Sequence, residues 1–150
     1  LQTMEGRVAQ AGEAEGIEFS FDRIARTPNT FDAHRLIWFA EQQGCQDGVV
    51  EALFYSYFTE GRDIGSFDSL AEIAAGCGLN REEVELFLAS DRGVQAVRAE
   101  EETGHRLGIR GVPYFLLNGS ISISGAQPPD IFVSVLQQAK DTVMERKEGA

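Results

Sequence analysis

The strongest constraint on the fold of this chain is a four-residue apolar run that is preceded by a proline and followed by a turn. Tyr114–Leu117 is typical of a strand buried on both faces of a sheet. The Asn-Gly pair behind it predicts a hairpin, because a tight turn between strands needs positive φ at both central positions. Pro113 suits the first residue of such a strand, where no N–H is required. Few X–Pro bonds are cis, so the residues alone favour a trans proline.

Most of the remaining sequence has helical periodicity. Apolar spacing, capping residues and glycine stops predict helices near residues 1–15, 31–43, 47–60, 69–76, 81–89 and 91–107, and a last one that begins at Pro128 or Pro129. A two-stranded sheet is marginal on its own, and no other segment offers a convincing neighbour for the Tyr114–Leu117 strand. The sequence begins with Leu1 rather than methionine. We therefore expect that part of the sheet is missing on the N-terminal side.

The charge balance argues against two classes of partner. The chain has 24 acidic and 13 basic residues, a net charge of −11, which repels nucleic-acid phosphates and anionic membrane surfaces. No apolar stretch approaches the length of a membrane span, and the first residues do not form a secretory signal. We expect a cytoplasmic protein with no nucleic-acid or membrane partner.

Cysteine and histidine are too sparse to suggest a metal site. Cys45 and Cys77 are far apart in the sequence, no C-x-x-C is present, and His34 and His105 are the only histidines. Both cysteines follow predicted helix ends, where the negative end of the helix dipole disfavours a thiolate. We therefore expect two reduced, partly buried thiols rather than a second redox pair, and neither a metal nor a cofactor.

Four stretches together resemble the DsbA-like thioredoxin-fold family, and in particular its FrnE-like branch. They are RTPNTFDAHRL (26–36), EALFYSYFTEGRDI (51–64), GVPYFLLNG (111–119) and SGAQPPDIF (124–132). The resemblance extends over about residues 1–139 and corresponds to the C-terminal two-thirds of a family member. It implies a mostly helical α/β chain with a partial thioredoxin-like fold. A helical insertion domain would span residues 1–107, the C-terminal hairpin and last helix 108–146, and a tail 147–150.

The resemblance also implies a chemistry, thiol–disulfide exchange on a protein or small thiol/disulfide substrate. In the family, the C-x-x-C that carries out this exchange precedes the helical insertion, and it is absent here. We therefore expect no catalytic residue within the chain, and no activity from the 150 residues alone. The resemblance implies that Pro113 is a cis proline and that Val112 offers its backbone to an extended substrate. Further candidate cleft residues are His34, Gly111 and Gln127.

Two other functions stay open. Hydroxychromene-carboxylate isomerases and kappa-class glutathione transferases share this architecture but use glutathione, and a serine in place of the first upstream cysteine would favour them. A non-enzymatic helical interaction module is the second alternative. Its unpaired hairpin edge would recruit strands, so we expect a homodimer or a strand-completed assembly of the isolated chain.

Overall fold

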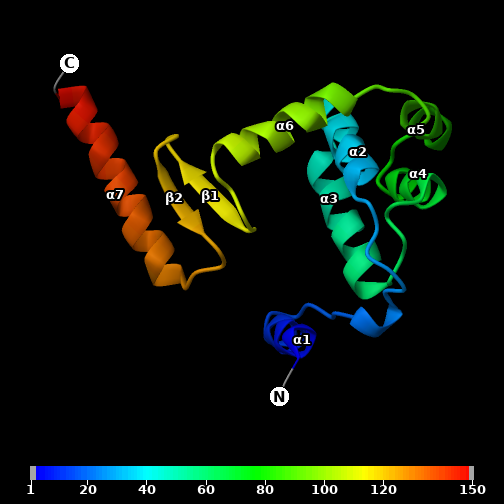
Figure 1. Cartoon of the computed structure of the whole chain (residues 1–150), viewed down its shortest axis with the longest axis horizontal. Coiled ribbons are helices and arrows are strands. Elements are labelled where there is room, and N and C mark those ends of the chain that lie inside the picture. Colours follow the sequence, from blue (N-terminus) through cyan, green and yellow to red (C-terminus); the bar gives the residue numbers. More distant parts are fainter. Residues whose placement is uncertain (1–2, 149–150) are drawn as a thin grey trace. The chain divides into compact units, whose positions relative to one another are not determined.

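Helices dominate the chain, and the described residues contain one small sheet (Figure 1). The computed structural model describes the backbone of residues 3–148 and the side chains of residues 3–142. This arrangement confirms the mostly helical class with a single hairpin. None of the helices in the described range combines the length and apolar character that crossing a bilayer requires.

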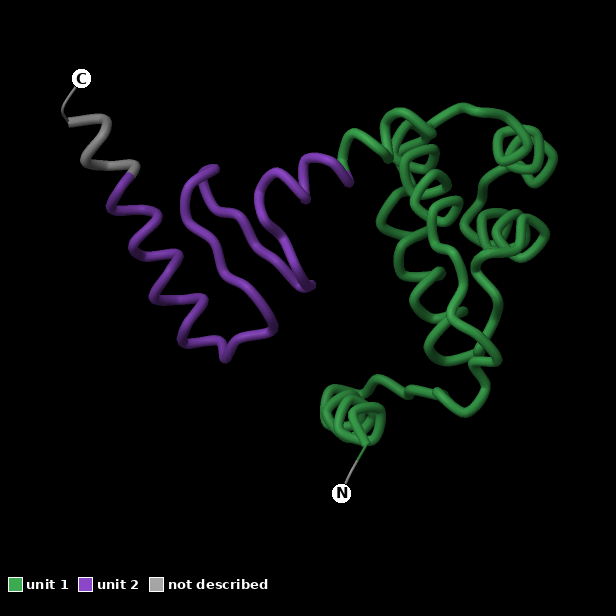
Figure 2. Tube along the Cα trace, in the orientation of Figure 1, with its two compact units in different colours: residues 1–100 green, residues 101–150 purple. Residues whose placement is uncertain are grey.

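The chain divides into two compact units, a helical unit of residues 1–100 and a hairpin unit of residues 101–150 (Figure 2). The division falls inside α6 (Val94–Arg106), whereas the sequence places the domain boundary at 107/108, just after this helix. Each unit is described by itself below.

The helical unit contains most of the predicted helices with small shifts at their ends. Its elements are α1 (Met4–Ala14), a 3-10 turn η1 (Phe21–Arg23), α2 (Phe31–Gln42), α3 (Gln46–Phe54), a π-helical turn η2 (Tyr55–Thr59), α4 (Phe67–Gly76), α5 (Arg81–Leu88) and the start of α6. Local chemistry explains the boundaries. The Asn80 side chain accepts a hydrogen bond from the Glu83 N–H at 3.0 Å, as the predicted cap requires. Gly44, which follows α2, has φ of +72°, a conformation that suits glycine.

The core of this unit lies between α2, α3, α4 and α5, which pack against one another (Figure 1). Its fully buried larger side chains are Leu36, Phe39, Val49, Leu70, Val84, Phe87 and Leu88. The Phe39 and Phe87 rings stack with their centroids 4.5 Å apart, which joins α2 to α5. The apolar stripes of four short helices thus cover one another, and no sheet is needed to stabilise them.

One charged side chain is buried in the same region. Arg35 on α2 is only 3% exposed, and its guanidinium donates to the Asp32 carboxylate at 2.7 Å. It also donates to four main-chain carbonyls at the end of α5 and in the following loop, those of Phe87, Leu88, Ser90 and Arg92. Because helix ends leave carbonyls unsatisfied, Arg35 both completes the end of α5 and joins it to α2.

The segment between α1 and α2 is a loop held by aromatic side chains. The Phe19 and Phe21 rings lie 5.6 and 6.3 Å from the ring of Phe58 on η2, and the Ser20 N–H donates to the Phe58 carbonyl at 2.8 Å. The alternating pattern of residues 17–22 fits either a short extended segment or such a loop, and the structure has the loop. Gly12 on α1 is buried against the Phe19 ring, so any side chain there would overlap this ring.

The hairpin unit contains β1 (Tyr114–Leu117), β2 (Ile121–Ser124) and α7 (Pro129–Glu148). The strands are antiparallel, with Tyr114 opposite Ser124 and Leu117 opposite Ile121. The predicted turn residues Asn118 and Gly119 have φ of 51° and 69°. α7 packs on one face of the hairpin, where the Phe115 and Phe132 rings meet edge to face at 4.9 Å.

Two expectations for the hairpin unit differ from the structure. β1 is not buried on both faces, since the successive residues Phe115 and Leu116, which point to opposite faces, are both exposed. The last helix begins at Pro129, as predicted, but it continues to Glu148 rather than giving way to a tail at residue 147. Residues 149–150 lie outside the described part of the chain.

Candidate functional site

The candidate site is the segment that leads into β1. The peptide bond between Val112 and Pro113 is cis. The Pro113 carbonyl accepts a hydrogen bond from the Gly125 N–H at 2.8 Å, which ties this segment to the loop after β2. Gly125 has φ of +82°, where residues with a side chain are strained. Gly125 lies in the loop that leads into the last helix, and its bond to Pro113 could not be predicted from the sequence.

Val112 is exposed to solvent. The residue is 89% exposed, and among the described residues no group forms a hydrogen bond with its backbone N–H or carbonyl. Gly111 before it is also exposed. An unpaired donor and acceptor at the end of a strand can pair with an extended peptide. Pro113 is therefore anchored by Gly125 while the preceding residue is open to a ligand.

The other two candidate residues lie in different units. The Gln127 amide donates to the Ser124 carbonyl at 3.0 Å, which places its side chain on the same loop as Gly125. His34 is exposed on α2, in the helical unit. The structure thus brings Gly111, Val112, Pro113 and Gln127 together in the hairpin unit, and His34 belongs to the other unit.

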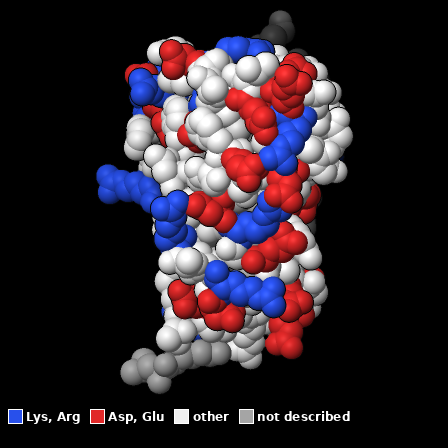
Figure 3. Space-filling view, turned by 90° about the vertical axis from the view of Figure 1, so that its right-hand side faces the viewer, with Lys and Arg blue, Asp and Glu red and all other residues white. Residues whose placement is uncertain are grey.

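Charged side chains are mixed rather than gathered by sign on the face that Figure 3 shows. In the helical unit, Arg81 forms ion pairs with Asp68 and Glu85. The pKa of Asp63 is lowered from its ordinary value. The hydrogen bond from Arg26 has the largest effect, and the hydrogen bond from the Gly65 N–H has the next largest. Within the described range, no three His, Cys, Asp or Glu side chains lie where they could hold a metal ion.

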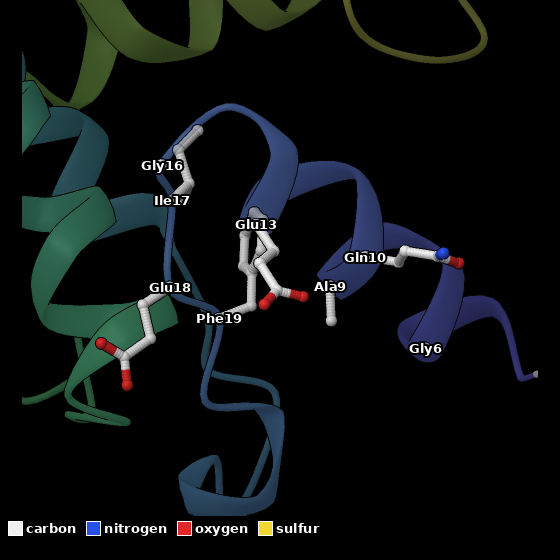
Figure 4. A pocket seen from close by; sticks show the side chains of 8 residues that line it. All are labelled: Gly6, Ala9, Gln10, Glu13, Gly16, Ile17, Glu18 and Phe19. Atoms are coloured by element: carbon white, nitrogen blue, oxygen red, sulfur yellow. The ribbon is translucent and has the colours of Figure 1, made fainter.

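A hollow lies beside α1 in the helical unit. It is lined by α1 and by the loop that follows it. The polar ends of Gln10, Glu13 and Glu18 point in different directions around it (Figure 4). Because specific ligand sites need polar groups that converge on the ligand, this hollow does not form a comparable site.

The two cysteines are of intermediate burial, in agreement with the prediction, and are not joined to one another in the structure. Cys77 follows α4 and Cys45 follows the end of α2, as expected, and the Cys45 N–H donates to the Ala40 carbonyl at 3.0 Å. Cys45 is also the N-cap residue of α3, but its side chain makes no capping bond to that helix. Burial raises the pKa of the Cys77 thiol, and a charge on Cys45 raises it further. The spacing of the two residues in the sequence carries no signal of this proximity.

Comparison with known proteins places the chain in a family. The family model described as a DSBA-like thioredoxin domain matches residues 1–137. The chain belongs to this DsbA-like thioredoxin-domain family. The match includes the whole helical unit and residues 111–113, so both the helices and the candidate site are part of the DsbA-like domain.

A solved structure supports the same assignment. The crystal structure of a probable DsbA oxidoreductase from Streptomyces coelicolor is 33% identical to this chain and superposes with a TM-score of 0.83. The similarity covers 93% of this chain but 60% of that protein, so the chain spans about 60% of the length of its DsbA-like relative. A search of curated proteins found no match. The predicted DsbA-like family and thioredoxin-like fold are therefore confirmed.

Proposed function

We propose that this sequence is part of a thiol–disulfide oxidoreductase of the FrnE-like branch of the DsbA family, in which residues 111–113 bind the substrate. The exposed, unpaired backbone of Val112 carries the proposal. The 150 residues contain no C-x-x-C. We therefore assign the redox dithiol to a part of the protein outside this sequence.

The role of this chain in the reaction is to bind and orient. An extended substrate segment pairs with the Val112 N–H and carbonyl as a short added strand. Pro113 has no N–H, and its carbonyl is engaged by Gly125, so Val112 alone sets the register of the substrate. A thiolate of the dithiol then attacks one sulfur of the substrate disulfide, and a mixed disulfide forms as the other sulfur leaves.

Peptide binding tests this role directly. The ¹⁵N-labelled chain is titrated with a short, unstructured peptide that contains an S-methylated cysteine, and amide shifts are recorded by NMR. We expect the Gly111 and Val112 amides to shift. A matched peptide with N-methylated backbone amides should bind at least about tenfold more weakly, because it loses a strand-pairing hydrogen bond and leaves a partner unsatisfied. Equal binding of both peptides, or shifts confined to other residues, would contradict the proposal.

An activity assay tests the location of the dithiol. The chain alone should reduce insulin disulfides in the presence of dithiothreitol no faster than dithiothreitol by itself. Turnover above this background would show that the chain carries its own catalytic thiols.

A titration of the ¹⁵N-labelled chain with reduced glutathione distinguishes the glutathione-using alternative. A shift of the Val112 amide signal with glutathione but not with the peptide would favour that alternative.

The free edge of β1 leads to a proposal about assembly. β1 pairs only with β2 among the described residues, and exposed strand edges recruit other strands. We propose that this edge pairs with a further strand, which comes from a second copy in the isolated chain, as a homodimer, and from another part of the protein in a longer chain. Light scattering during size-exclusion chromatography should show a concentration-dependent dimer, and a strict monomer at all concentrations would contradict this.

A further inference from the structure

The helical unit contains two thiols that the substrate-binding segment does not use. Cys45 lies between α2 and α3, and Cys77 directly follows α4. Both pack against the core formed by α2, α3, α4 and α5, and both stay partly exposed. The fold therefore brings two residues that are distant in the sequence to the rim of one core.

Hydrogen bonds at the start of α3 show how close the two cysteines are. The Cys77 Sγ lies 3.5 Å from the Gly48 carbonyl oxygen. Gly48 is in the turn that begins at Cys45, since the Val49 N–H donates to the Cys45 carbonyl at 3.2 Å. Residues three positions apart on a helix lie about 5–6 Å from one another. The Cys77 thiol thus lies beside the helical turn that Cys45 opens, and a charge on Cys45 reaches it.

We propose that Cys45 and Cys77 form a reversible disulfide, a second redox pair that is independent of the dithiol of the DsbA-like domain. The existing bonds of the two thiols do not oppose it. Each Sγ donates only one long hydrogen bond to a backbone carbonyl, at 3.7 Å from Cys45 to Ala40 and at 3.5 Å from Cys77 to Gly48. Thiols are weak donors, so little is lost when these two bonds are given up.

The oxidant is a low-molecular-weight disulfide such as oxidised glutathione. The Cys45 thiolate attacks one of its sulfurs, the S–S bond breaks, and one small thiolate leaves. Cys77 then loses its proton and attacks the Cys45 sulfur of the mixed disulfide, which releases the second small thiolate. In total, two protein thiols become one disulfide, one small disulfide becomes two small thiols, and two electrons pass from the protein to the oxidant.

The order of the two steps follows from the surroundings of Cys77. Burial and the neighbouring sulfur raise the pKa of Cys77, so this residue is suited to the second, intramolecular step. The closed disulfide would connect the start of α3 to the end of α4 and restrict the unfolded chain.

Mass spectrometry of the full 150-residue chain tests the proposal. The reduced protein is equilibrated with mixtures of reduced and oxidised glutathione, quenched with acid, and alkylated. We expect a species that has lost two hydrogens, carries no alkyl group or glutathione, and yields a peptide that links Cys45 to Cys77. Its fraction should not change over a tenfold dilution of the protein. It should also melt several degrees above the reduced form.

Single-thiol variants provide the matched controls. Cys45→Ser and Cys77→Ser should each accumulate a mixed disulfide with glutathione that the wild type resolves. A wild type that stays reduced, or that carries one or two glutathiones with no internal link at any ratio, overturns the proposal. A link that appears only between molecules does the same. The result does not depend on insulin reduction or peptide binding, so it stands apart from the proposed function.

Discussion

The helical unit and the hairpin unit differ in how far they bury their own apolar side chains. Among the described residues, the buried apolar side chains lie between positions 33 and 97, with the exception of Ile123 and Ala139. Over its described residues, the hairpin unit, which is half as long, exposes as many large apolar side chains as the helical unit: Leu107, Val112, Phe115, Leu116, Ile131, Val133 and Leu136. Burial of apolar area is the main stabilising contribution to folding. The comparison therefore indicates a helical unit that is stable by itself and a hairpin unit whose apolar surface is suited to further contacts.

Truncation of one apolar side chain in each unit tests this comparison most strongly. Phe39 is 1% exposed, and Phe39→Ala should lower the free energy of unfolding by about 3–5 kcal/mol. Leu116 is 43% exposed, and Leu116→Ala should change it by no more than about 0.5 kcal/mol. Fluorescence of Trp38, the only tryptophan, reports urea unfolding of the helical unit, because its ring stacks on Phe87. Equal effects of the two variants would contradict the comparison.

A second variant asks whether the stability of the helical unit also depends on a polar contact. Arg35→Met keeps an unbranched side chain like the apolar stem of arginine but removes the donor for four carbonyls and the partner of Asp32. We expect a loss of about 3 kcal/mol in urea unfolding, because buried groups are left unsatisfied. Arg81→Met is the control, since Arg81 is exposed and its ion pairs should contribute little to stability. A loss for Arg35→Met no greater than that for Arg81→Met would show that Arg35 is not important for stability.

The predictable features of this fold are those that depend on neighbours in the sequence. Asn80 caps α5, Asn118 and Gly119 form the turn, and Pro129 starts α7, as their residue types indicate. The clamp that Arg35 forms could not be predicted, because its carbonyl partners are more than 50 positions away. The same holds for the proximity of Cys45 and Cys77, which exists only after α3 and α4 have packed.

The candidate site was predictable to a similar extent. Residues 111–113 and Gln127 come from motifs that the family resemblance supplied, and the structure places them in one unit. The exposure of Val112 and the bond between Pro113 and Gly125 depend on the pairing of β1 with β2. Apolar pattern alone wrongly suggested that β1 is buried on both faces, since the pattern does not show which elements pack on those faces.

Removal of a buried, unpaired hydroxyl group in the helical unit should stabilise the protein by a smaller amount. The Ser69 hydroxyl on α4 is buried and has no hydrogen-bond partner among the described residues. Ser69→Ala should raise the free energy of unfolding by about 1 kcal/mol, because it removes an unsatisfied polar group and favours the helix. Ser134→Ala on α7 is the control for helix preference alone, since Ser134 is exposed. A destabilised Ser69→Ala would indicate that this hydroxyl does have a stabilising partner.

The smallest effect concerns an exposed ion pair and depends on pH. Arg26 and the Gly65 N–H lower the pKa of Asp63, so the folded state favours its carboxylate. The resulting stabilisation is present above the ordinary pKa of 3.8 and is lost as pH falls through the lowered value. Asp63→Asn should therefore melt slightly below the wild type at pH 7, and the difference should close in acid. A double-mutant cycle with Arg26→Gln should show that the two changes are coupled, and additive changes would contradict this.

The π-helical turn η2 has a consequence for how relatives of this chain should be aligned. Such a turn accommodates one extra residue within a helix. A relative with one residue fewer over Tyr55–Thr59 would continue α3 as a regular helix, and each later position would rotate by about 100°. The Phe58 carbonyl would then no longer meet the Ser20 N–H, nor the Thr59 hydroxyl the Glu18 carbonyl. A single-residue gap at this point in an alignment would thus identify proteins that attach their first helix to the helical unit in a different way.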